Sequence, residues 1–450
     1  MKKVYIETFG CQMNVSDSER VATRLISDDF EITANEAAAD VVLINTCSVR
    51  EKAEHKLYTR VGQIRKSARE NKENKLKKKQ IVGVLGCVAQ LEGETLFAGR
   101  NEIDFVLGTK AVGRVSQAIE KVLAGQKNYF DLGEREASYD WSVAERQRHS
   151  SFVAFVPIIE GCNKFCTYCI VPFSRGREKS LSASEIIRQV LNLRQQGVRE
   201  VHLIGQNVNS YRPPTDSGLK NFRGATPFSK LLRAVAATGI ERIKFNTSFP
   251  RDFHPDIVDA ICENENLCNW VHLPVQSGSN NVLREMRRGH TIESYLEKID
   301  KIKSSPRKLS LTTDVIIGFP NETDRDFQDT LKMAHYCKFD SAYIFKYSPR
   351  PGTPAFAMTD TVSEQVKTAR FLELEELIRH DQRRIFKTYL NNTIEVLAEK
   401  ISNKNDSELS GHTTCQKVVN FKGSTELLGN IVKVKITGTK TNTLYGEICV

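Results

Sequence analysis

The alternation of strand-like and helical segments beyond Ser151 constrains the fold more than any other feature of this sequence. Six short runs are rich in β-branched and aromatic residues, and segments with helical periodicity separate them. The runs are SFVAFVPIIE, VREVHLIG, ERIKFNTSF, NWVHLPVQ, LSLTTDVIIGF and SAYIFKY. Such an alternation predicts parallel strands joined by helical crossovers, here a partial (β/α)6 barrel. In barrels of this kind the chemistry takes place at the carboxyl ends of the strands.

An earlier part of the chain also predicts a parallel sheet, and here cysteines follow the strands. Cys11, Cys47 and Cys87 each come at or just after the end of an apolar run. The runs are Val4–Phe9, Asp40–Thr46 and Gln80–Gly86. Because the carboxyl ends of parallel strands meet at one edge of a sheet, we expect the three distant cysteines to lie together.

The sequence therefore predicts an α/β protein of three domains. Residues 1–125 form an α/β domain with a parallel sheet, residues 148–382 form the partial barrel, and residues 383–450 form a small antiparallel β-barrel. The polar stretch between about 122 and 150 is interpreted as a linker.

The C-terminal prediction depends on a change of pattern after a long amphipathic helix, which is expected at about 363–389. Short strands follow this helix. In the strand IVKVKI, branched apolar residues alternate with Lys433 and Lys435, so one face can be buried while the other meets solvent or phosphate.

The charge of the chain favours a polyanionic partner, because its formal net charge is +10. The lysine run at Lys75, Lys77, Lys78 and Lys79 is interpreted mainly as a solvated loop, with RNA contact as the alternative. A run of about 18 apolar residues and a signal peptide are both missing from the sequence, so we expect a cytoplasmic protein with no membrane segment. In that reducing compartment, eleven cysteines favour metal binding over disulfides.

The most specific motif is GCNKFCTYC, which follows the first barrel strand and contains Cys162, Cys166 and Cys169. Three thiolates on a four-iron, four-sulfur cluster leave one iron open, and S-adenosylmethionine (SAM) can chelate that iron. The alternative is a zinc site that takes a fourth ligand from elsewhere, for example His202.

Polar residues at the ends of the later barrel strands, or within one of them in the case of Asp314, are candidate SAM contacts. They are Gln206, Asn207, Ser248, Gln276 and Asp314. Each could instead cap a helix or satisfy a buried backbone group. Arg175 and Arg177 follow the cysteine loop closely; they could meet an anionic substrate or form surface salt bridges.

These motifs resemble those of the radical SAM methylthiotransferases over the whole chain. GCNKFCTYCIVPFSRGRE looks like their radical SAM signature, and FGCQMNVSDSE (9–19) is similar to the opening motif of the bacterial branch that acts on isopentenyl-adenosine in transfer RNA. Further matches are LIGQNVNSY, HLPVQSGSN, MRRGHT, DVIIGFPNET and YSPRPGTPA. The resemblance implies an N-terminal methylthiotransferase domain, a radical SAM core and a C-terminal RNA-binding TRAM domain.

The resemblance also implies how the site residues are used. Cys11, Cys47 and Cys87 would hold an auxiliary four-iron, four-sulfur cluster, and Cys162, Cys166 and Cys169 the cluster that binds SAM. Tyr168 would lie beside the adenine of SAM. One SAM would methylate a sulfur carried on the auxiliary cluster, and a second would give the radical that removes hydrogen from position 2 of isopentenyl-adenosine beside the anticodon. The partners would be tRNA and an electron donor such as flavodoxin or ferredoxin, and the protein would be a monomer.

The sister branches of the family are the closest alternatives. One acts on threonylcarbamoyl-adenosine in tRNA and the other on an aspartate of a ribosomal protein; the motif CQMN in this chain argues against both. A non-enzymatic iron-sulfur sensor that binds RNA is an alternative of another class. The chain departs from the family at GHT (411–413), where the TRAM domain usually begins with GRT, and His412 therefore puts the strength of RNA binding in doubt, although Lys417, Lys422, Lys433 and Lys435 keep the region basic.

Overall fold

The computed structural model describes residues 1–48, 51–73, 80–98, 102–134, 143–402 and 405–449, and the chain forms two compact units. The first unit comprises residues 1–150, 160–163 and 169–179. The second comprises residues 151–159, 164–168 and 180–450. The predicted lysine run at 75–79 lies outside the described residues.

The first unit is built on a six-stranded parallel sheet in the order β2-β1-β3-β4-β5-β6. Its strands are β1 (Lys3–Phe9), β2 (Glu31–Ile32), β3 (Val41–Thr46), β4 (Ile81–Gly86), β5 (Phe105–Leu107) and β6 (Tyr129–Asp131). The three strands predicted before the cysteines are β1, β3 and β4, and they are neighbours in the sheet. β3 is buried along its whole length, as expected for a parallel strand covered on both faces.

Helices connect these strands, and two apolar clusters of buried residues form the core. The helices are α1 (Gln12–Ser27), η1 (Glu36–Ala38), α2 (Glu51–Glu73), α3 (Cys87–Glu92), η2 (Gly93–Phe97), η3 (Val112–Arg114), α4 (Val115–Leu123), η4 (Glu145–Gln147) and α5 (Val171–Arg175). The predicted linker at about 122–150 is wrong in part, because β6 lies inside it and pairs with β5. Three residues in a polar stretch are too short a run to show a strand pattern.

The second unit contains the predicted barrel strands as two parallel three-stranded sheets, in the orders β11-β10-β7 and β12-β13-β14. A parallel bridge between Ile243 and Leu267 connects the end of one sheet to the segment that leads into the other. The strands of these sheets are β7 (Val153–Pro157), β10 (Glu200–Ile204), β11 (Arg242–Phe245), β12 (Trp270–His272), β13 (Ser310–Ile317) and β14 (Ser341–Lys346). The short strands β8 (Ile159–Glu160) and β9 (Lys179–Ser180) form a separate two-stranded sheet. The partial (β/α)6 barrel is confirmed.

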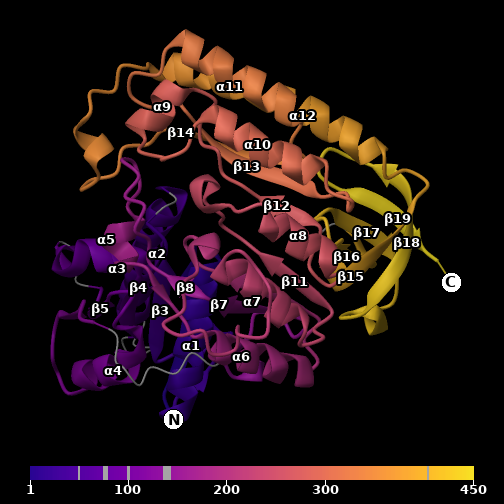
Figure 1. The fold of residues 1–450 in the computed structure, drawn as a ribbon. Helices are drawn as coiled ribbons and strands as arrows, with labels where there is room; N and C mark the ends of the chain where they lie inside the picture. Colours follow the sequence, from indigo (N-terminus) through magenta and orange to yellow (C-terminus); the bar gives the residue numbers. More distant parts are fainter. Residues whose placement is uncertain (49–50, 74–79, 99–101, 135–142, 403–404, 450) are drawn as a thin grey trace. The chain divides into compact units, whose positions relative to one another are not determined.

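Helices follow the barrel strands, and α10, α11 and α12 lie along β13 and β14 in Figure 1. The helices are α6 (Ala183–Gln195), η5 (Val208–Ser210), α7 (Pro227–Ala236), η6 (Pro250–Asp252), α8 (Asp256–Glu263), α9 (Asn280–Glu285), α10 (Ile292–Lys303), α11 (Asp324–Cys337), η7 (Pro354–Ala357) and α12 (Glu364–Lys387). α12 is the predicted long helix, and the Ser363 side chain caps it by accepting from the Val366 amide.

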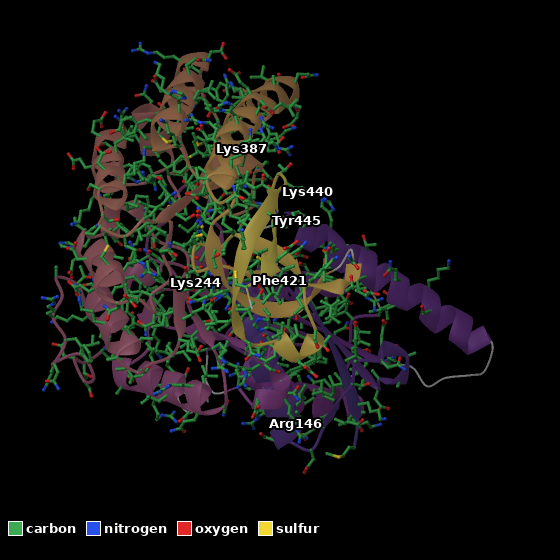
Figure 2. The ribbon with its side chains drawn as sticks, turned by 90° about the vertical axis from the view of Figure 1, so that its right-hand side faces the viewer. Arg146, Lys244, Lys387, Phe421, Lys440 and Tyr445 are labelled. Atoms are coloured by element: carbon green, nitrogen blue, oxygen red, sulfur yellow. The ribbon has the colours of Figure 1, made fainter. Side chains whose placement is uncertain are left out.

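The C-terminal strands close into a small barrel in the order β15-β16-β17-β19-β18. They are β15 (Thr393–Ser402), β16 (Asn405–His412), β17 (Val418–Lys422), β18 (Ile431–Thr439) and β19 (Leu444–Ile448), with η8 (Thr425–Leu427) between β17 and β18. The barrel is antiparallel as predicted, except that β17 and β19 pair in parallel. Figure 2 shows Phe421 in the barrel, where it belongs to the buried core, while Lys433 and Lys435 are exposed as the alternation predicted.

Among the described residues, every helix is too short or too polar to serve as a membrane span.

Candidate functional site

The sheet of the first unit gathers Cys11, Cys47 and Cys87 at one edge. The last residues of β1, β3 and β4 are paired with one another, so the three strands end at the same level of the sheet. Each cysteine follows within two residues. Cys11 is the N-cap of α1, and Cys87 is the first residue of α3. The backbone approaches closely here, because a Cβ atom on Gly10 would lie 2.7 Å from the Cβ of Cys47. The fold therefore brings the three cysteines, which are distant in sequence, to the same edge of the sheet, as expected.

Asn14 and Asn45 hold the strand ends in place. The Asn14 side chain donates to the carbonyl oxygen of Thr46 at 3.3 Å and to Oδ1 of Asn45 at 3.1 Å, while its own Oδ1 accepts from the Cys11 thiol at 3.2 Å. Asn45 in turn donates to the Asn14 carbonyl at 2.9 Å. Both asparagines are fully buried, so these bonds fix the cysteine edge rather than a solvated surface.

A buried ion network lies beside these cysteines. The Nη2 atom of Arg175 is 2.7 Å from Oδ2 of Asp17, and its Nη1 atom is 3.4 Å from Oε1 of Glu160. Only 2% of the Arg175 side chain and 1% of the Asp17 side chain are exposed. The two roles considered for Arg175 in the sequence, an anionic substrate contact or a surface salt bridge, are thus wrong. Sequence alone gave no signal that Asp17 would pair with it across the fold.

The pKa values of Cys11 and Cys87 respond to burial, to hydrogen bonding and to this network. Hydrogen bonding with Cys47 lowers the pKa of Cys11 to about 6; burial opposes the shift and the Arg175 charge adds to it. Burial raises the pKa of Cys87, and the Arg175 charge works against that rise. Burial alone would lower the pKa of Arg175, but Asp17 and the other nearby anions raise it well above its usual value. A permanent positive charge therefore faces a group of soft, ionisable sulfur atoms, which suits a thiolate-bound metal cluster.

The cysteine loop of the second motif lies between β8 and α5, and its three cysteines are not joined by disulfides. Cys162 and Cys166 are buried, and Cys169 is half-buried. Phe165 adopts a φ of +47°, a conformation that non-glycine residues rarely accept and that is enriched at functional sites. Thr167 fixes the middle of the loop, because its amide donates to the Met286 carbonyl at 3.1 Å and its hydroxyl to the Glu285 carbonyl at 2.8 Å.

Arg288 contacts this loop, and from the sequence no role could be predicted for it beyond membership of the motif MRRGHT. Its Nη1 atom donates to Sγ of Cys166 at 3.5 Å and to the hydroxyl of Tyr168 at 3.3 Å, and its Nη2 atom donates to the Pro274 carbonyl at 2.8 Å. Its guanidinium carbon lies 4.2 Å from the centroid of the Phe249 ring. Tyr168 packs edge-on against Phe319, with the ring centroids 6.5 Å apart.

The other candidate SAM contacts lie near the ends of barrel strands. Asn207 and Ser248 follow β10 and β11, and the Val208 amide donates to the Thr247 carbonyl at 3.0 Å, which joins the two loops. Within the described part of the chain, Oδ1 of Asn207 and Oγ of Ser248 are buried without a hydrogen-bond partner. Buried polar atoms of this kind are costly unless a ligand satisfies them, so these two residues fit a polar cofactor.

Gln206, Gln276 and Asp314 complete the candidate set. Gln206 lies directly before Asn207 and is half-buried. Gln276 has a φ of +77° and forms a bridge with Val315 on the neighbouring strand, so its backbone is held in an uncommon conformation. Asp314 lies inside β13, as the sequence predicts, and its carboxylate is 3.5 Å from Nε2 of His272.

Two residues expected near the chemistry or the RNA belong instead to a second buried network, which connects β10 to the C-terminal barrel. His202 and His412 both reach the Glu200 carboxylate, with Nε2 to Oε1 distances of 2.5 Å and 2.9 Å. Arg242 binds the other oxygen of Glu200 at 2.8 Å, and Glu399 lies 3.0 Å from Nδ1 of His412. The zinc alternative with His202 has no support, because this side chain is engaged here.

The departure at His412 therefore concerns packing of the barrel. Only 11% of its side chain is exposed. Lys417, which was expected to keep the region basic, is also turned inward, and its Nζ atom lies 2.6 Å from Oδ1 of Asp340. The expectation is wrong for Lys417 alone, because its buried partner is distant in sequence; Lys422, Lys433 and Lys435 are exposed.

Comparisons with known proteins agree with this architecture. Residues 156–334 match the family described as "Radical SAM superfamily", residues 3–108 match "Uncharacterized protein family UPF0004", and residues 387–449 match "TRAM domain". Among solved structures, the radical SAM methyltransferase TsrM from Kitasatospora setae has a TM-score of 0.57 at 12% identity and covers 79% of this chain and 77% of its own. The radical enzyme OxsB has a TM-score of 0.51 at 12% identity, with 84% of this chain and 56% of its own covered. These likenesses show the fold alone.

Curated relatives match the chain from end to end. It is 41% identical to the tRNA-2-methylthio-N(6)-dimethylallyladenosine synthase of Koribacter versatilis, with 99% of this chain and 98% of that protein covered. The protein of the same name from Photobacterium profundum is 40% identical, with 99% of this chain and 92% of its own covered. Membership of the radical SAM superfamily implies SAM and a four-iron, four-sulfur cluster. The chain belongs to the radical SAM methylthiotransferase family that includes these synthases.

Proposed function

We propose that this protein transfers a methylthio group to position 2 of isopentenyl-adenosine beside the anticodon of tRNA, with SAM as both methyl donor and radical source. The observation that carries the proposal is the end-to-end similarity to synthases named for that product, at 41% and 40% identity. The alternatives in the sister branches have no comparable support, because the relatives described above carry the isopentenyl-adenosine name.

Two separate triplets of cysteine support a proposal of two clusters. Cys11, Cys47 and Cys87 would hold an auxiliary four-iron, four-sulfur cluster, and Cys162, Cys166 and Cys169 would hold the cluster that binds SAM. The six cysteines are not joined by disulfides, most are buried, and Arg175 and Arg288 lie beside members of the two triplets. Thiolates are the ligands that such clusters take. When bound, the SAM cluster supplies the radical chemistry needed to remove an unactivated hydrogen.

The chain's own residues would bind and orient SAM at the ends of the barrel strands. Oδ1 of Asn207 and Oγ of Ser248 are buried acceptors that await a donor, and the Tyr168 ring is held in place by Phe319 and Arg288. Gln206 and Gln276, which follow barrel strands, and Asp314, which lies inside β13, complete the proposed contact set.

The remaining partners follow from the same proposal. The exposed lysines of the C-terminal barrel, with Lys433 and Lys435 on one strand face, would contact the tRNA backbone. A low-potential electron donor such as flavodoxin or ferredoxin would reduce the SAM cluster. We further propose that the protein acts as a monomer in the cytoplasm, and that its domains have the limits predicted from the sequence.

Mass spectrometry of tRNA nucleosides from a strain lacking the gene tests the proposed substrate. We expect methylthio-isopentenyl-adenosine to disappear and isopentenyl-adenosine to accumulate, and a plasmid-borne copy to restore the modification. A Cys449→Ala copy is the matched control, because this exposed cysteine lies outside both triplets. Unchanged methylthio-isopentenyl-adenosine in the deletion strain would refute the proposal, and loss of the threonylcarbamoyl-adenosine derivative would favour the sister branch.

Anaerobic reconstitution separates the enzyme from an iron-sulfur sensor. We expect about eight iron and eight sulfide per chain from two clusters, and 5'-deoxyadenosine when SAM and a reductant are added. A sensor would bind iron but give no 5'-deoxyadenosine.

A further inference from the structure

Arg288 is buried beside the SAM-cluster loop, and its contacts form a fixed set. Only 5% of the residue is exposed. One guanidinium nitrogen reaches both Sγ of Cys166 at 3.5 Å and the Tyr168 hydroxyl at 3.3 Å, while the other donates to the Pro274 carbonyl at 2.8 Å. The planar fork of arginine can meet these groups from two nitrogens at once, which the single ammonium of lysine cannot do.

The backbone holds Arg288 in register with the cysteine loop. Thr167 of the cysteine loop donates its amide and hydroxyl to the carbonyls at the end of α9. Its own carbonyl accepts from the Ala355 amide at 2.8 Å. The Arg288 amide donates to the Leu283 carbonyl at 2.9 Å, which closes the turn after α9. The approach of Arg288 to Cys166 is therefore set by main-chain bonds on both sides and does not depend on a flexible side chain alone.

The charge on Arg288 is placed where it would act on a cluster sulfur. The Phe249 ring, 4.2 Å from the guanidinium carbon, covers one side of the cation and excludes water. In such a dry site, a hydrogen bond to a ligand sulfur is stronger than in water, and hydrogen bonds to sulfur together with net charge set the reduction potential of an iron-sulfur cluster.

We propose that Arg288 is a positioning residue of the SAM cluster, which donates a hydrogen bond to the Cys166 sulfur and stabilises the reduced state while it holds Tyr168 in place. The inference rests on the proposed ligand role of Cys166. Reduction adds one electron from a low-potential donor of the flavodoxin or ferredoxin class and makes the cluster one unit more negative, with no bond formed or broken. A fixed cation next to the sulfur favours that more negative state.

A redox titration of the reconstituted full-length protein, followed by electron paramagnetic resonance, tests this role. The SAM cluster is identified as the part of the signal that changes when SAM is added, and the midpoint is then measured without SAM. In Arg288→Gln we expect iron and sulfide to stay at the wild-type level and the equilibrium constant for reduction to fall about tenfold. For a one-electron couple this is a midpoint about 59 mV lower.

Two further variants keep the experiment decisive. Arg284→Gln removes one positive charge from the exposed side of α9 and should leave the midpoint unchanged. Arg288→Lys keeps the charge but loses the fork, so we expect a midpoint between wild type and the glutamine variant. If the glutamine variant does not retain its cluster, the lysine variant decides: a lower midpoint supports the proposal, and a wild-type midpoint overturns it.

The outcomes separate this inference from the proposed function. Wild-type protein with no SAM-responsive signal would overturn both the ligand role of Cys166 and the role of Arg288. A SAM-responsive signal with the same midpoint in wild type and in Arg288→Gln would overturn the role of Arg288 alone. Neither result depends on which nucleoside is modified.

Discussion

The two cysteine triplets of this protein are built in different ways. Cys11, Cys47 and Cys87 come from three strand ends and meet only when β1, β3 and β4 have paired. The other triplet occupies one short loop between β8 and α5. One centre therefore depends on the long-range topology of a sheet, and the other on local loop conformation.

The buried arginines beside the two triplets differ in their side-chain partners. Arg175 is held by the carboxylates of Asp17 and Glu160, so much of its charge is balanced within the protein. Arg288 contacts a thiol, a phenol, a carbonyl and an aromatic ring. Both arginines therefore lie beside thiols, and the charge of Arg175 is in addition shared with the carboxylates of Asp17 and Glu160.

The largest expected effect separates the two triplets by function. Cys166→Ala should lose about four iron per chain and form no 5'-deoxyadenosine above background, because an open iron at that loop is the proposed SAM site. Cys47→Ala should also lose about four iron but should still cleave SAM, while methylthiolation of tRNA stops. Iron analysis and chromatography of the SAM products measure this. Equal loss of cleavage in both variants would break the division of labour.

The next effect concerns stability of the first unit. Arg175→Met leaves the Glu160 carboxylate and Oδ2 of Asp17 buried without this cation, while Oδ1 of Asp17 keeps its ion pair with Arg20 at 3.3 Å. Breaking a buried pair costs about 3–5 kcal/mol, and the retained pair with Arg20 makes this an upper limit here. Urea unfolding of the metal-free protein should show a clearly lower midpoint. Arg24→Met is the matched control, because Arg24 pairs with Asp28 on the surface of α1, with 52% of its side chain exposed, and should cost about 0.5 kcal/mol or less. Equal midpoints for the two variants would show that the buried network contributes little.

The strand ends of both units could be predicted because their patterns are strong and local. β3 and β4 are continuous apolar runs, and a cysteine directly after each run marks the edge of the sheet. That the three cysteines of the second motif lie in one loop could be predicted from their spacing alone. In each case the signal lies within about ten neighbouring residues, which is the range over which a single sequence is informative.

The charged residues could not be predicted because their partners are distant in sequence. The sequence around Arg175 is typical of a surface residue, but in the fold Asp17 of α1 pairs with it in the interior. From the sequence, Lys417 is expected to keep the TRAM region basic and His412 to affect RNA binding. In the structure their side chains bind Asp340 and Glu200 instead. Burial of an ion depends on the partner it finds in the folded chain, and no periodicity encodes that pairing.

Histidine makes the network at the C-terminal barrel sensitive to pH, whereas the Arg175 network keeps its charge. Burial would lower the pKa of His412, but the charges and hydrogen bonds of Glu200 and Glu399 outweigh it and raise that pKa. A raised pKa stabilises the fold fully below about pH 6.5, and this stability is lost as the pH rises through the folded value. Each unit of the shift corresponds to about 1.4 kcal/mol.

The melting temperature measured from pH 6.5 to pH 9 tests this. It should fall more steeply with pH for wild type than for His412→Gln, which keeps a hydrogen-bonding side chain but does not titrate. The window avoids His202, because burial lowers the pKa of His202 to about 4 and its titration lies below it. Parallel pH curves for the two proteins would contradict a charged His412 in the folded state.

The smallest expected effect measures how far the charge of Arg175 is balanced by the carboxylates of Asp17 and Glu160. Asp17→Asn keeps a hydrogen-bond acceptor for Arg175 but removes one negative charge, so the guanidinium should act more strongly on the auxiliary centre. We expect the midpoint of the signal that SAM does not change to rise, by less than the 59 mV of a tenfold change. Asp28→Asn, at an ion pair at the C-terminal end of α1 and away from Asp17, should leave it unchanged. A lower midpoint in Asp17→Asn would mean that Arg175 needs Asp17 to stay in place, and the contrast with Arg288 would then be one of geometry rather than of charge.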